Sequence, residues 1–242
     1  MTLTLAERMD HYTMDYMFGP ENDYSNSERG NFWKRQLKGG MVSALGYALG
    51  HKDYDVVNKA YLHSSTEFTY QDQIDVLLID ASRDFERVVD MGCGRGELPY
   101  AIATMGKQVM GVDPMPDFQD AYAKTIRLWD DGKNGVNLSY LKSDFIGAVD
   151  TIHEFEPDTF ILCETIEHIP EEEFKSVWED YVTVFRENET LFIITNWIHY
   201  HPLETNSNWE HIWRIDDGVY DWLSSYAKEV VYRRGSHLVL QF

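Results

Sequence analysis

The sequence predicts an α/β protein with a seven-stranded, mostly parallel sheet, helices on both faces and a helical segment in front of it. Three observations lead to this class. From Glu86 onward, short apolar runs alternate with helical patterns, as in a parallel sheet joined by crossover helices. The first run, Arg87–Met91, leads into a turn with three glycines at alternate positions. A content of 43% hydrophobic residues in a chain of 242 suffices for the core of one such domain.

The region before this alternation, residues 1–82, reads as helical. Ser64 is placed to cap the last of its helical patterns, and the segments between them are rich in glycine, proline and asparagine. The three patterns are Leu3–Met17, Asn31–Leu49 and Thr66–Ile79. We therefore expect residues 1–82 to form a helical cap or lid, and residues 83–242 to form the ligand-binding domain.

The elements of the second region follow one another as βα repeats. The expected strands are Arg87–Met91, Gln108–Val112, Leu138–Leu141, Thr159–Cys163, Leu191–Thr195, Glu229–Tyr232 and Leu238–Phe242. The expected helices are Glu97–Met105, Asp117–Trp129, Glu171–Phe185 and Asp216–Tyr226. A long loop rich in aromatic residues and histidine, Trp197–Ile215, follows the fifth strand. The last two strands are expected to form a hairpin around Arg234-Gly235-Ser236.

Bulk composition excludes several function classes. The net charge of −20 disfavours indiscriminate binding to nucleic acid or to an anionic membrane, because phosphate would be repelled on average. Two cysteines without metal-type spacing make no disulfide framework. No stretch reaches the length of a membrane span, and the first residues lack the pattern of a secretory signal. We expect a cytoplasmic protein with reduced thiols.

The glycine-rich turn and the acid after the second strand together indicate a nucleoside ligand. Glycine allows a sharp turn with positive φ and lets a ligand approach the backbone without meeting a Cβ atom. Asp113 lies 19 residues after Gly94, at the end of the run VMGVD. A carboxylate at that place accepts the ribose hydroxyls of a nucleoside. The alternative is that Asp113 is only a turn residue before Pro114.

Four motifs in order, VVDMGCGRG, VMGVD, LKSDF and FILCETIEHIP, resemble those of the class I S-adenosylmethionine-dependent methyltransferases. The resemblance extends from Glu86 to the C-terminus. Loops that bind NAD usually have GxGxxG, whereas this chain has DxGxGxG, the methyltransferase form. The resemblance implies a Rossmann-like fold and S-adenosylmethionine as the cofactor.

The same resemblance assigns roles along the cofactor. It implies contacts from Asp90, Gly92, Cys93, Gly94, Gly96, Asp113, Pro114, Asp144, Phe145 and Cys163. The glycine turn would pass under the methionine part, and Asp113 would take the ribose hydroxyls. Asp144 would receive the adenine amino group, with Phe145 beside the ring. Cys163 would end the fourth strand beside the sulfonium methyl.

The segment after the fourth strand carries the candidate catalytic residues. Glu164, Glu167 and His168 stand at i, i+3 and i+4, so they share one face if Glu164 begins a helical turn. Oxygen and imidazole ligands suit Mg²⁺ or Mn²⁺. Many small-molecule methyltransferases have a similar EHIP segment without a metal, in which the histidine is structural or a general base. We predict Glu164, His168 and the later His211 as catalytic residues.

A weaker resemblance concerns the small-RNA 3′-terminal 2′-O-methyltransferases. It rests on ETIEH and on a later histidine flanked by aromatic residues, and it implies a metal held by Glu164, Glu167, His168 and His211. Such a metal would lower the pKa of a ribose hydroxyl. The chain departs from this family. Its fifth strand ends TNW in place of TPN, basic residues around the second histidine are missing, and the protein is acidic.

Three functions are therefore carried forward. The first is S-adenosylmethionine-dependent methylation of an oxygen or nitrogen of a small molecule. The second is metal-dependent 2′-O-methylation of RNA 3′ ends, which the acidic charge disfavours. The third is a catalytically silent module that binds S-adenosylmethionine and regulates a partner. No Asn/Asp-Pro-Pro-Tyr/Phe sequence follows the fourth strand, which argues against methylation of DNA-base amino groups or glutamine amides.

Overall fold

A computed structural model gives the fold of the central and C-terminal parts of the chain. The residues that it describes are 4–6, 78, 81–94, 96–103, 105–114, 137–195, 212–213, 215–234 and 237–242. The expected helical cap of residues 1–82 lies almost wholly outside this set. So do the expected helix Asp117–Trp129 and most of the loop Trp197–Ile215.

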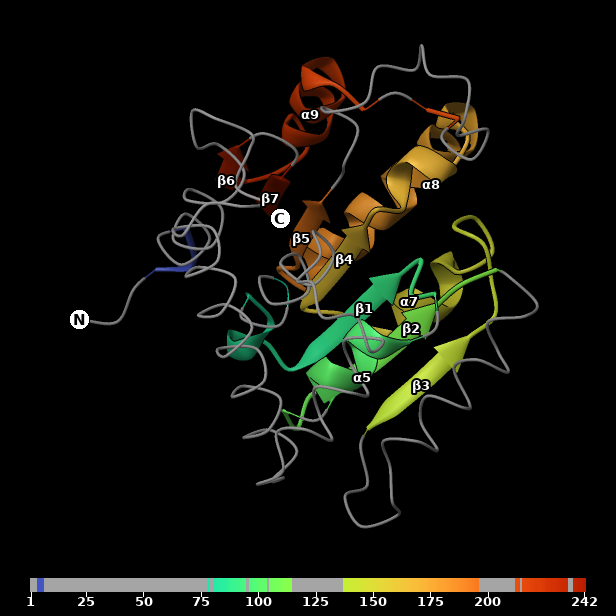
Figure 1. Ribbon diagram of the computed structural model, residues 1–242. Coiled ribbons are helices and arrows are strands. Elements are labelled where there is room, and N and C mark those ends of the chain that lie inside the picture. Colours follow the sequence, from blue (N-terminus) through green and yellow to red (C-terminus); the bar gives the residue numbers. More distant parts are fainter. Residues whose placement is uncertain are drawn as a thin grey trace, which may run out of the picture.

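The seven-stranded sheet predicted from the sequence is confirmed (Figure 1). Its strands are β1 (Arg87–Met91), β2 (Gln108–Val112), β3 (Leu138–Leu141), β4 (Thr159–Cys163), β5 (Leu191–Thr195), β6 (Glu229–Arg234) and β7 (His237–Gln241). The strand order is β3-β2-β1-β4-β5-β7-β6. Strands β1 to β5 pair in parallel, and β7 runs antiparallel to both of its neighbours, so β6 and β7 form the expected hairpin.

The described helices agree with the predicted pattern, with one addition. They are α5 (Glu97–Ala103), α7 (Val149–Phe155), α8 (Glu171–Glu187) and α9 (Asp217–Ser224), with short 3-10 turns η1 (Ser82–Asp84) and η2 (Ile166–His168). Sequence analysis missed α7. It has only seven residues, its N-cap Ala148 offers no side-chain hydrogen bond, and only Ile152 and Phe155 are buried. A helix this short has too few apolar positions to show a period.

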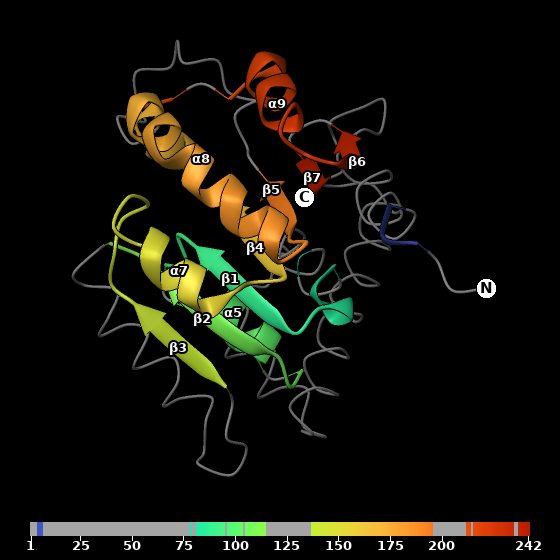
Figure 2. The same cartoon turned by 180° about the vertical axis from the view of Figure 1, so that it is seen from behind.

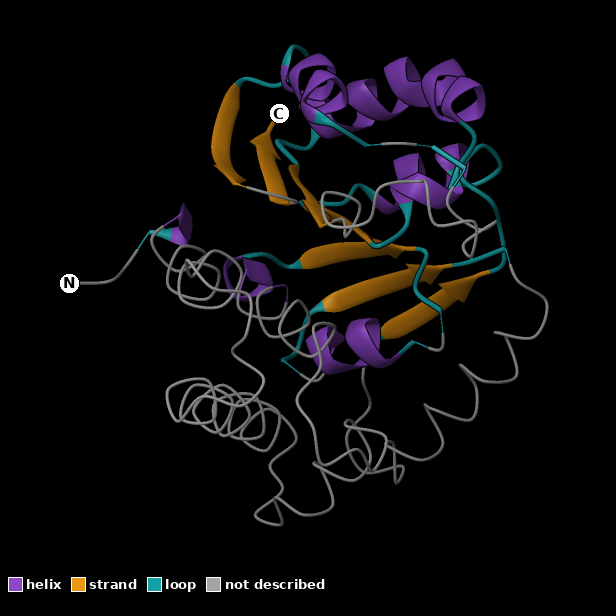
Figure 3. Cartoon of the chain, turned by 45° about the horizontal axis from the view of Figure 1, so that its top comes forward, coloured by secondary structure: helices purple, strands orange, loops and turns teal. Residues whose placement is uncertain are grey.

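The helices cover both faces of the sheet, as predicted (Figure 3). Helix α5 packs on β1, β2 and β3 from one side. Helices α7 and α8 contact each other on the opposite side, where α9 also lies (Figure 2). Side chains alternate along each strand, as the pleat requires. In β4, for example, Phe160 and Leu162 belong to the core beneath α8, while Ile161 is buried on the α5 face.

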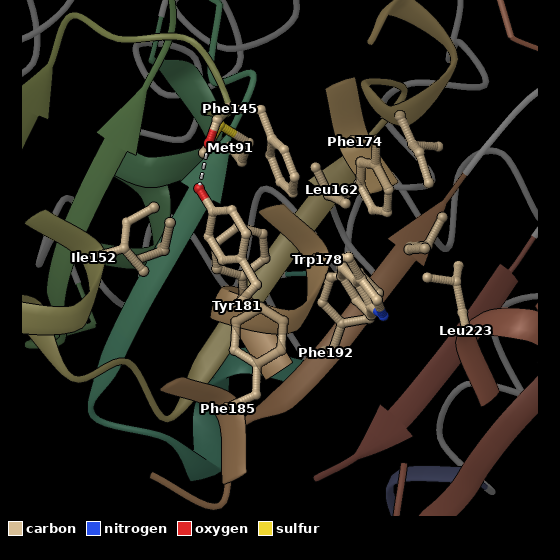
Figure 4. Close-up of a cluster of buried hydrophobic side chains, with 14 of the residues drawn as sticks. Met91, Phe145, Ile152, Leu162, Phe174, Trp178, Tyr181, Phe185, Phe192 and Leu223 are labelled. Carbon is tan, nitrogen blue, oxygen red and sulfur yellow. Dashed lines mark hydrogen bonds between the residues drawn. The ribbon is translucent and has the colours of Figure 1, made fainter. Parts of the chain in front are cut away.

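An aromatic cluster joins α8 to the middle of the sheet (Figure 4). Trp178 and Tyr181 of α8 are completely buried. The Trp178 ring lies 5.3 Å from that of Phe192 on β5, and the Tyr181 ring lies 5.5 Å from that of Phe160 on β4. Aromatic rings bury large apolar areas, and pairs of rings add a further stabilisation beyond that from the buried area. The cluster therefore fixes β4 and β5, whose ends carry the candidate site, against a rigid helix.

Candidate functional site

Most of the predicted site residues lie where the parallel strands end. In the register of the sheet Met91 pairs with Val112, Val112 with Leu141, and Met91 with Leu162. The segments that follow β1, β2, β3 and β4 therefore leave the sheet side by side. The parallel strands point the same way in Figure 3. Ligands of open parallel sheets bind outside these carboxyl ends, so the predicted site residues lie at the edge of the sheet where a ligand is expected.

The glycine-rich turn after β1 is tied to the end of β2. Gly92 and Cys93 both donate their backbone N–H to the carbonyl of Val112, at 2.7 and 3.1 Å. The φ angles of Gly92, Gly94 and Gly96 are +80°, +52° and +82°, a conformation that other residues seldom adopt. The backbone conformation of this turn is therefore by itself a sufficient reason for glycine at these three positions.

Gly92 and Gly94 differ in what a side chain would meet. A Cβ atom on Gly92 would lie 2.2 Å from Oγ1 of Thr165, so this glycine is needed for packing against the segment after β4. A Cβ atom on Gly94 would have no atom of the described part of the chain within 4 Å. Of the two, only Gly94 presents its backbone to open space. The sequence pattern predicts that both glycines lie under the methionine part of the cofactor, because the contact between Gly92 and Thr165 is visible only in the folded chain.

Thr165 connects the two central strand ends. Its hydroxyl donates to the carbonyl of Met91 at 3.0 Å or to that of Cys163 at 2.8 Å. The threonine thereby holds the glycine turn against the residues that follow β4. Sequence analysis did not identify Thr165, since a lone threonine in a loop gives no signal.

Asp113 is part of the glycine turn's hydrogen-bond network. It is 5% exposed, and its Oδ2 accepts the backbone N–H of Gly94 at 3.0 Å. The hydroxyl of Tyr140 on β3 donates to the Asp113 carbonyl at 2.9 Å. Burial, followed by the nearby Cys93 and Asp113, raises the pKa of Tyr140 to about 12. Tyr140 therefore remains a neutral hydroxyl at this end of the site, and it is a second residue that sequence analysis missed.

The turn after β3 places Asp144 and Phe145 in different environments. Asp144 is exposed, and its Oδ1 accepts the N–H of Gly147 at 2.7 Å. Phe145 is buried and stacks on Phe174 and Tyr181, with ring centroids 4.6 and 4.3 Å apart (Figure 4). Its ring thus belongs to the aromatic core. The neighbouring Ile146 is the exposed apolar side chain of this turn, at 42%.

The remaining predicted cofactor residues vary in exposure. Asp90 and Cys93 are buried, Cys163 is half-buried and Pro114 is exposed. Asp90 pairs with Ile161 of β4, one row below the strand ends. A buried carboxylate beside an open backbone is a suitable partner for a cationic ligand.

The expectation that Glu164, Glu167 and His168 share one face is wrong. Glu164 has a φ of +48°, so it is not part of a helical turn, and η2 begins only at Ile166. Its N–H donates instead to the carbonyl of Thr195 at the end of β5, at 2.9 Å. Glu167 is fully buried, whereas His168 is exposed. The 3-10 turn directs these two neighbours to different environments.

Glu167 is the most unusual titratable group near the site. Its side chain is 0% exposed, and among the described residues neither carboxyl oxygen has a hydrogen-bond partner. Burial is the main cause that raises its pKa to about 7, and the dipole of its own backbone N–H opposes this in part. Its carbonyl accepts the N–H groups of Ile212 and Trp213 at 2.9 and 3.1 Å. These bonds place Ile212 and Trp213 beside η2. The predicted site residue His211 lies outside the described residues.

The described residues do not assemble the ligands of a metal ion. No group of three or more histidine, cysteine or acidic side chains converges in the part of the chain that the structure describes. The unpartnered carboxyl of Glu167 is the one feature that suits a cation, but the exposed His168 does not share its surroundings. The described residues alone therefore do not complete a metal site. Within the same residues, no helix has the length and apolarity needed to cross a bilayer.

Comparisons with known proteins agree with this geometry at the level of the fold. No protein-family model and no curated protein matches the chain. Among solved structures, it is similar to the small RNA methyltransferase HEN1, with a TM-score of 0.54, 15% identity and coverage of 73% of this chain and 26% of that one. Similarity to monomeric WbdD has a TM-score of 0.52 and 15% identity, covering 75% and 43%.

A third similar structure is magnesium protoporphyrin IX methyltransferase from Synechocystis PCC 6803 with bound S-adenosylhomocysteine. Its TM-score is 0.48 and its identity 13%, with coverage of 78% of this chain and 92% of that one. The chain spans less than half of the HEN1 and WbdD structures that it matches. The sheet order and the similarity to the HEN1 and WbdD structures establish a Rossmann-like fold, which the chain shares with a small RNA methyltransferase.

Proposed function

We propose that this chain, which has the class I methyltransferase fold, is an S-adenosylmethionine-dependent methyltransferase that acts on an oxygen or nitrogen of a small molecule. One observation supports this most. Asp90, the open backbone of Gly94, Asp113 and Asp144 lie along the carboxyl ends of three adjacent parallel strands. That order matches the methionine, ribose and adenine parts of the cofactor.

The residues present suit this cofactor. Gly94 offers a surface without a Cβ atom, and its N–H already fixes one oxygen of Asp113. The Asp113 carboxylate has acceptor capacity beyond that bond, because an ionised carboxylate has about four lone-pair sites. Asp144 likewise uses Oδ1 in its turn, which leaves Oδ2 for an amino group. The exposed Ile146 can cover one face of an adenine ring.

In this proposal the protein contributes binding and alignment. S-adenosylmethionine supplies an activated methyl group on a sulfonium, which an acceptor atom attacks directly. The turn from Gly92 to Gly96 and the two acids after β1 and β2 hold the donor in one orientation. Thr165 keeps the turn at a fixed place relative to Cys163. Fixing two reactants in line is a large part of the catalysis that such a transfer needs.

Deprotonation of the acceptor is assigned to the segment after β4. His168 is exposed and is the described imidazole nearest in sequence to the strand end. Glu164 is held in place by the bond of its N–H to Thr195. A left-handed conformation at a residue other than glycine costs free energy and occurs often at functional sites. We keep Glu164, His168 and His211 as catalytic candidates on this basis.

Asp113→Asn tests the cofactor assignment. The asparagine keeps an oxygen for the N–H of Gly94 but loses the charge that attracts ribose hydroxyls. Hydrogen bonds to charged groups contribute about 1.5–3 kcal/mol, so the Kd for S-adenosylhomocysteine should rise roughly 10- to 150-fold. Isothermal titration calorimetry measures this. Asp150→Asn, an exposed acid on α7, is the matched control and should bind like the parent. Equal affinities of the two variants would contradict the assignment.

The metal-dependent RNA methyltransferase remains the second candidate, and Glu167 favours it. A buried carboxyl without partners beside the chain that leads to His211 is what one ligand of such a site requires. The described residues do not complete the site, and we derive no step through a metal. Turnover of an RNA 3′ end that is abolished by EDTA and restored by Mn²⁺ would establish this candidate. Turnover of a small acceptor in EDTA would eliminate it.

A silent cofactor-binding module is distinguished by turnover alone. An acceptor screen that follows S-adenosylhomocysteine release should detect product with at least one small hydroxyl or amine compound. Cofactor binding without product across oxygen, nitrogen and RNA acceptors would favour the regulatory module.

A further inference from the structure

A row of side chains runs from the proposed methyl donor across the end of the sheet. Cys163 of β4 pairs with Thr195 of β5, and Thr195 pairs with His237 of β7. Paired residues project to the same side of a sheet. Because β7 is antiparallel, its first residue lies at the same edge as the last residues of β4 and β5. The three side chains therefore share the edge where the cofactor is expected.

This row lies on the face opposite the aromatic core. The alternation along β4, β5 and β7 assigns Leu162, Ile194 and Leu238 to the core under α8. Cys163, Thr195 and His237 therefore point to the other face, which is also the face of Asp90. One pleat further into the sheet this face is apolar, with Ile161, Ile193 and Val239. Polar side chains thus begin where the strands end.

Thr195 has the clearest sign of an absent partner. Its side chain is 0% exposed, and its hydroxyl makes no hydrogen bond with any residue that the structure describes. A buried hydroxyl without a partner costs free energy, so such groups usually bond to water or to a ligand. Neighbouring strands are about 5 Å apart. The proposed position of the sulfonium methyl is at Cys163 on β4. Thr195 is therefore on the adjacent strand, and His237 is on the strand after that.

His237 adds a second hydrogen-bonding group to the row. It is 1% exposed, and burial lowers its pKa to about 4. At neutral pH it is therefore an uncharged imidazole, which has one donor and one acceptor nitrogen. Arg234 of β6 pairs with His237 and extends the row with a positive charge. A cationic acceptor would be repelled at that end.

We infer that Thr195 and His237 form the polar wall of the acceptor pocket and position an acceptor that carries a hydroxyl group and no positive charge. The inference rests on the proposed function, because it places the methyl donor at Cys163. Both residues are positioning residues. Thr195 donates to or accepts from the acceptor hydroxyl, and His237 holds a second polar group about 5 Å further along the row.

The first test is a crystal structure of the full chain with S-adenosylhomocysteine, grown with ethylene glycol as the hydroxyl probe. A water or glycol oxygen bonded to Thr195 Oγ1 on the side facing the sulfur is expected. A dry site, with the hydroxyl covered by protein atoms alone, would overturn the inference. Failure to bind S-adenosylhomocysteine at all would instead count against the proposed function, so the two failures are distinguishable.

The second test is kinetic and uses a control within the same sheet. Thr159 is also completely buried with an unpartnered hydroxyl, and it lies on the same face at the opposite end of β4. Thr195→Val should raise the acceptor KM about tenfold, the usual effect of one lost hydrogen bond. Thr159→Val and Thr195→Ser should leave KM unchanged. Equal KM values for all three variants, or equal losses in the two valine variants, would contradict the inference.

Discussion

Gly92→Ala is expected to destabilise the protein by about 3 kcal/mol. Two effects add. A residue other than glycine at a φ of +80° is strained, and the new Cβ atom would lie 2.2 Å from Thr165 Oγ1. Thr165 cannot move freely, because its hydroxyl bonds to the carbonyl groups of Met91 and Cys163. Thermal and urea denaturation of the variant measure the loss.

Gly94→Ala is the matched control for this prediction. Its φ of +52° costs about 1 kcal/mol for alanine, and the Cβ atom meets no atom of the residues that the structure describes. The protein should therefore stay folded, while the methyl group occupies space that we assign to the cofactor. S-adenosylmethionine affinity should fall while the melting temperature changes little. An unaltered affinity for S-adenosylmethionine would show that the space beside Gly94 is not the cofactor site.

Glu167→Gln is expected to raise the free energy of unfolding by about 3 kcal/mol at pH 8, and by little at pH 4.5. The folded-state pKa of about 7 lies above the ordinary value of 4.5. The unfolded chain therefore ionises first, and stability falls as pH rises from 4.5 to 7. Above pH 7 the loss is complete. Glutamine does not ionise, so the variant avoids this loss of stability. Urea denaturation at several pH values checks this difference.

Two controls separate burial of the Glu167 charge from metal binding. Glu172→Gln, at an exposed position on the first turn of α8, keeps Glu167 and should therefore lose stability with rising pH as the parent does. If Glu167 is only a buried acid, added Mg²⁺ or Mn²⁺ should not change the difference in free energy of unfolding between the parent and Glu167→Gln. If the ion stabilises the parent but not Glu167→Gln, Glu167 is a metal ligand and the RNA candidate gains support.

The sequence was sufficient for the sheet because each strand is marked by its own residues. The run RVVDM is apolar except for its acid and is followed by glycines, and FILC and LFIIT are continuous apolar runs. Continuous runs are typical of strands buried on both faces. The order of the strands and the antiparallel β7 are not visible in these local patterns. The sequence predicted a hairpin of the last two strands but no strand order, and the pairing now establishes both.

The site was less accessible to sequence reasoning, because side-chain neighbours depend on tertiary contacts. The spacing of Glu164, Glu167 and His168 predicted one face, but a left-handed Glu164 and a 3-10 turn separate them. Phe145 follows the acid after β3, yet two aromatic residues of α8, Phe174 and Tyr181, stack on it in the core. Thr195 gave no signal at all, since its buried hydroxyl is recognisable only in the folded chain.

Titration of the folded full-length chain with S-adenosylmethionine in a calorimeter tests the central claim most directly. We predict saturable binding at one site per chain, weakened in both Gly94→Ala and Asp113→Asn and unchanged in Asp150→Asn. A folded parent protein that binds neither S-adenosylmethionine nor S-adenosylhomocysteine would contradict the assignment of the glycine-rich turn. Binding of equal strength in all four proteins would contradict the placement of the cofactor at the ends of β1 and β2.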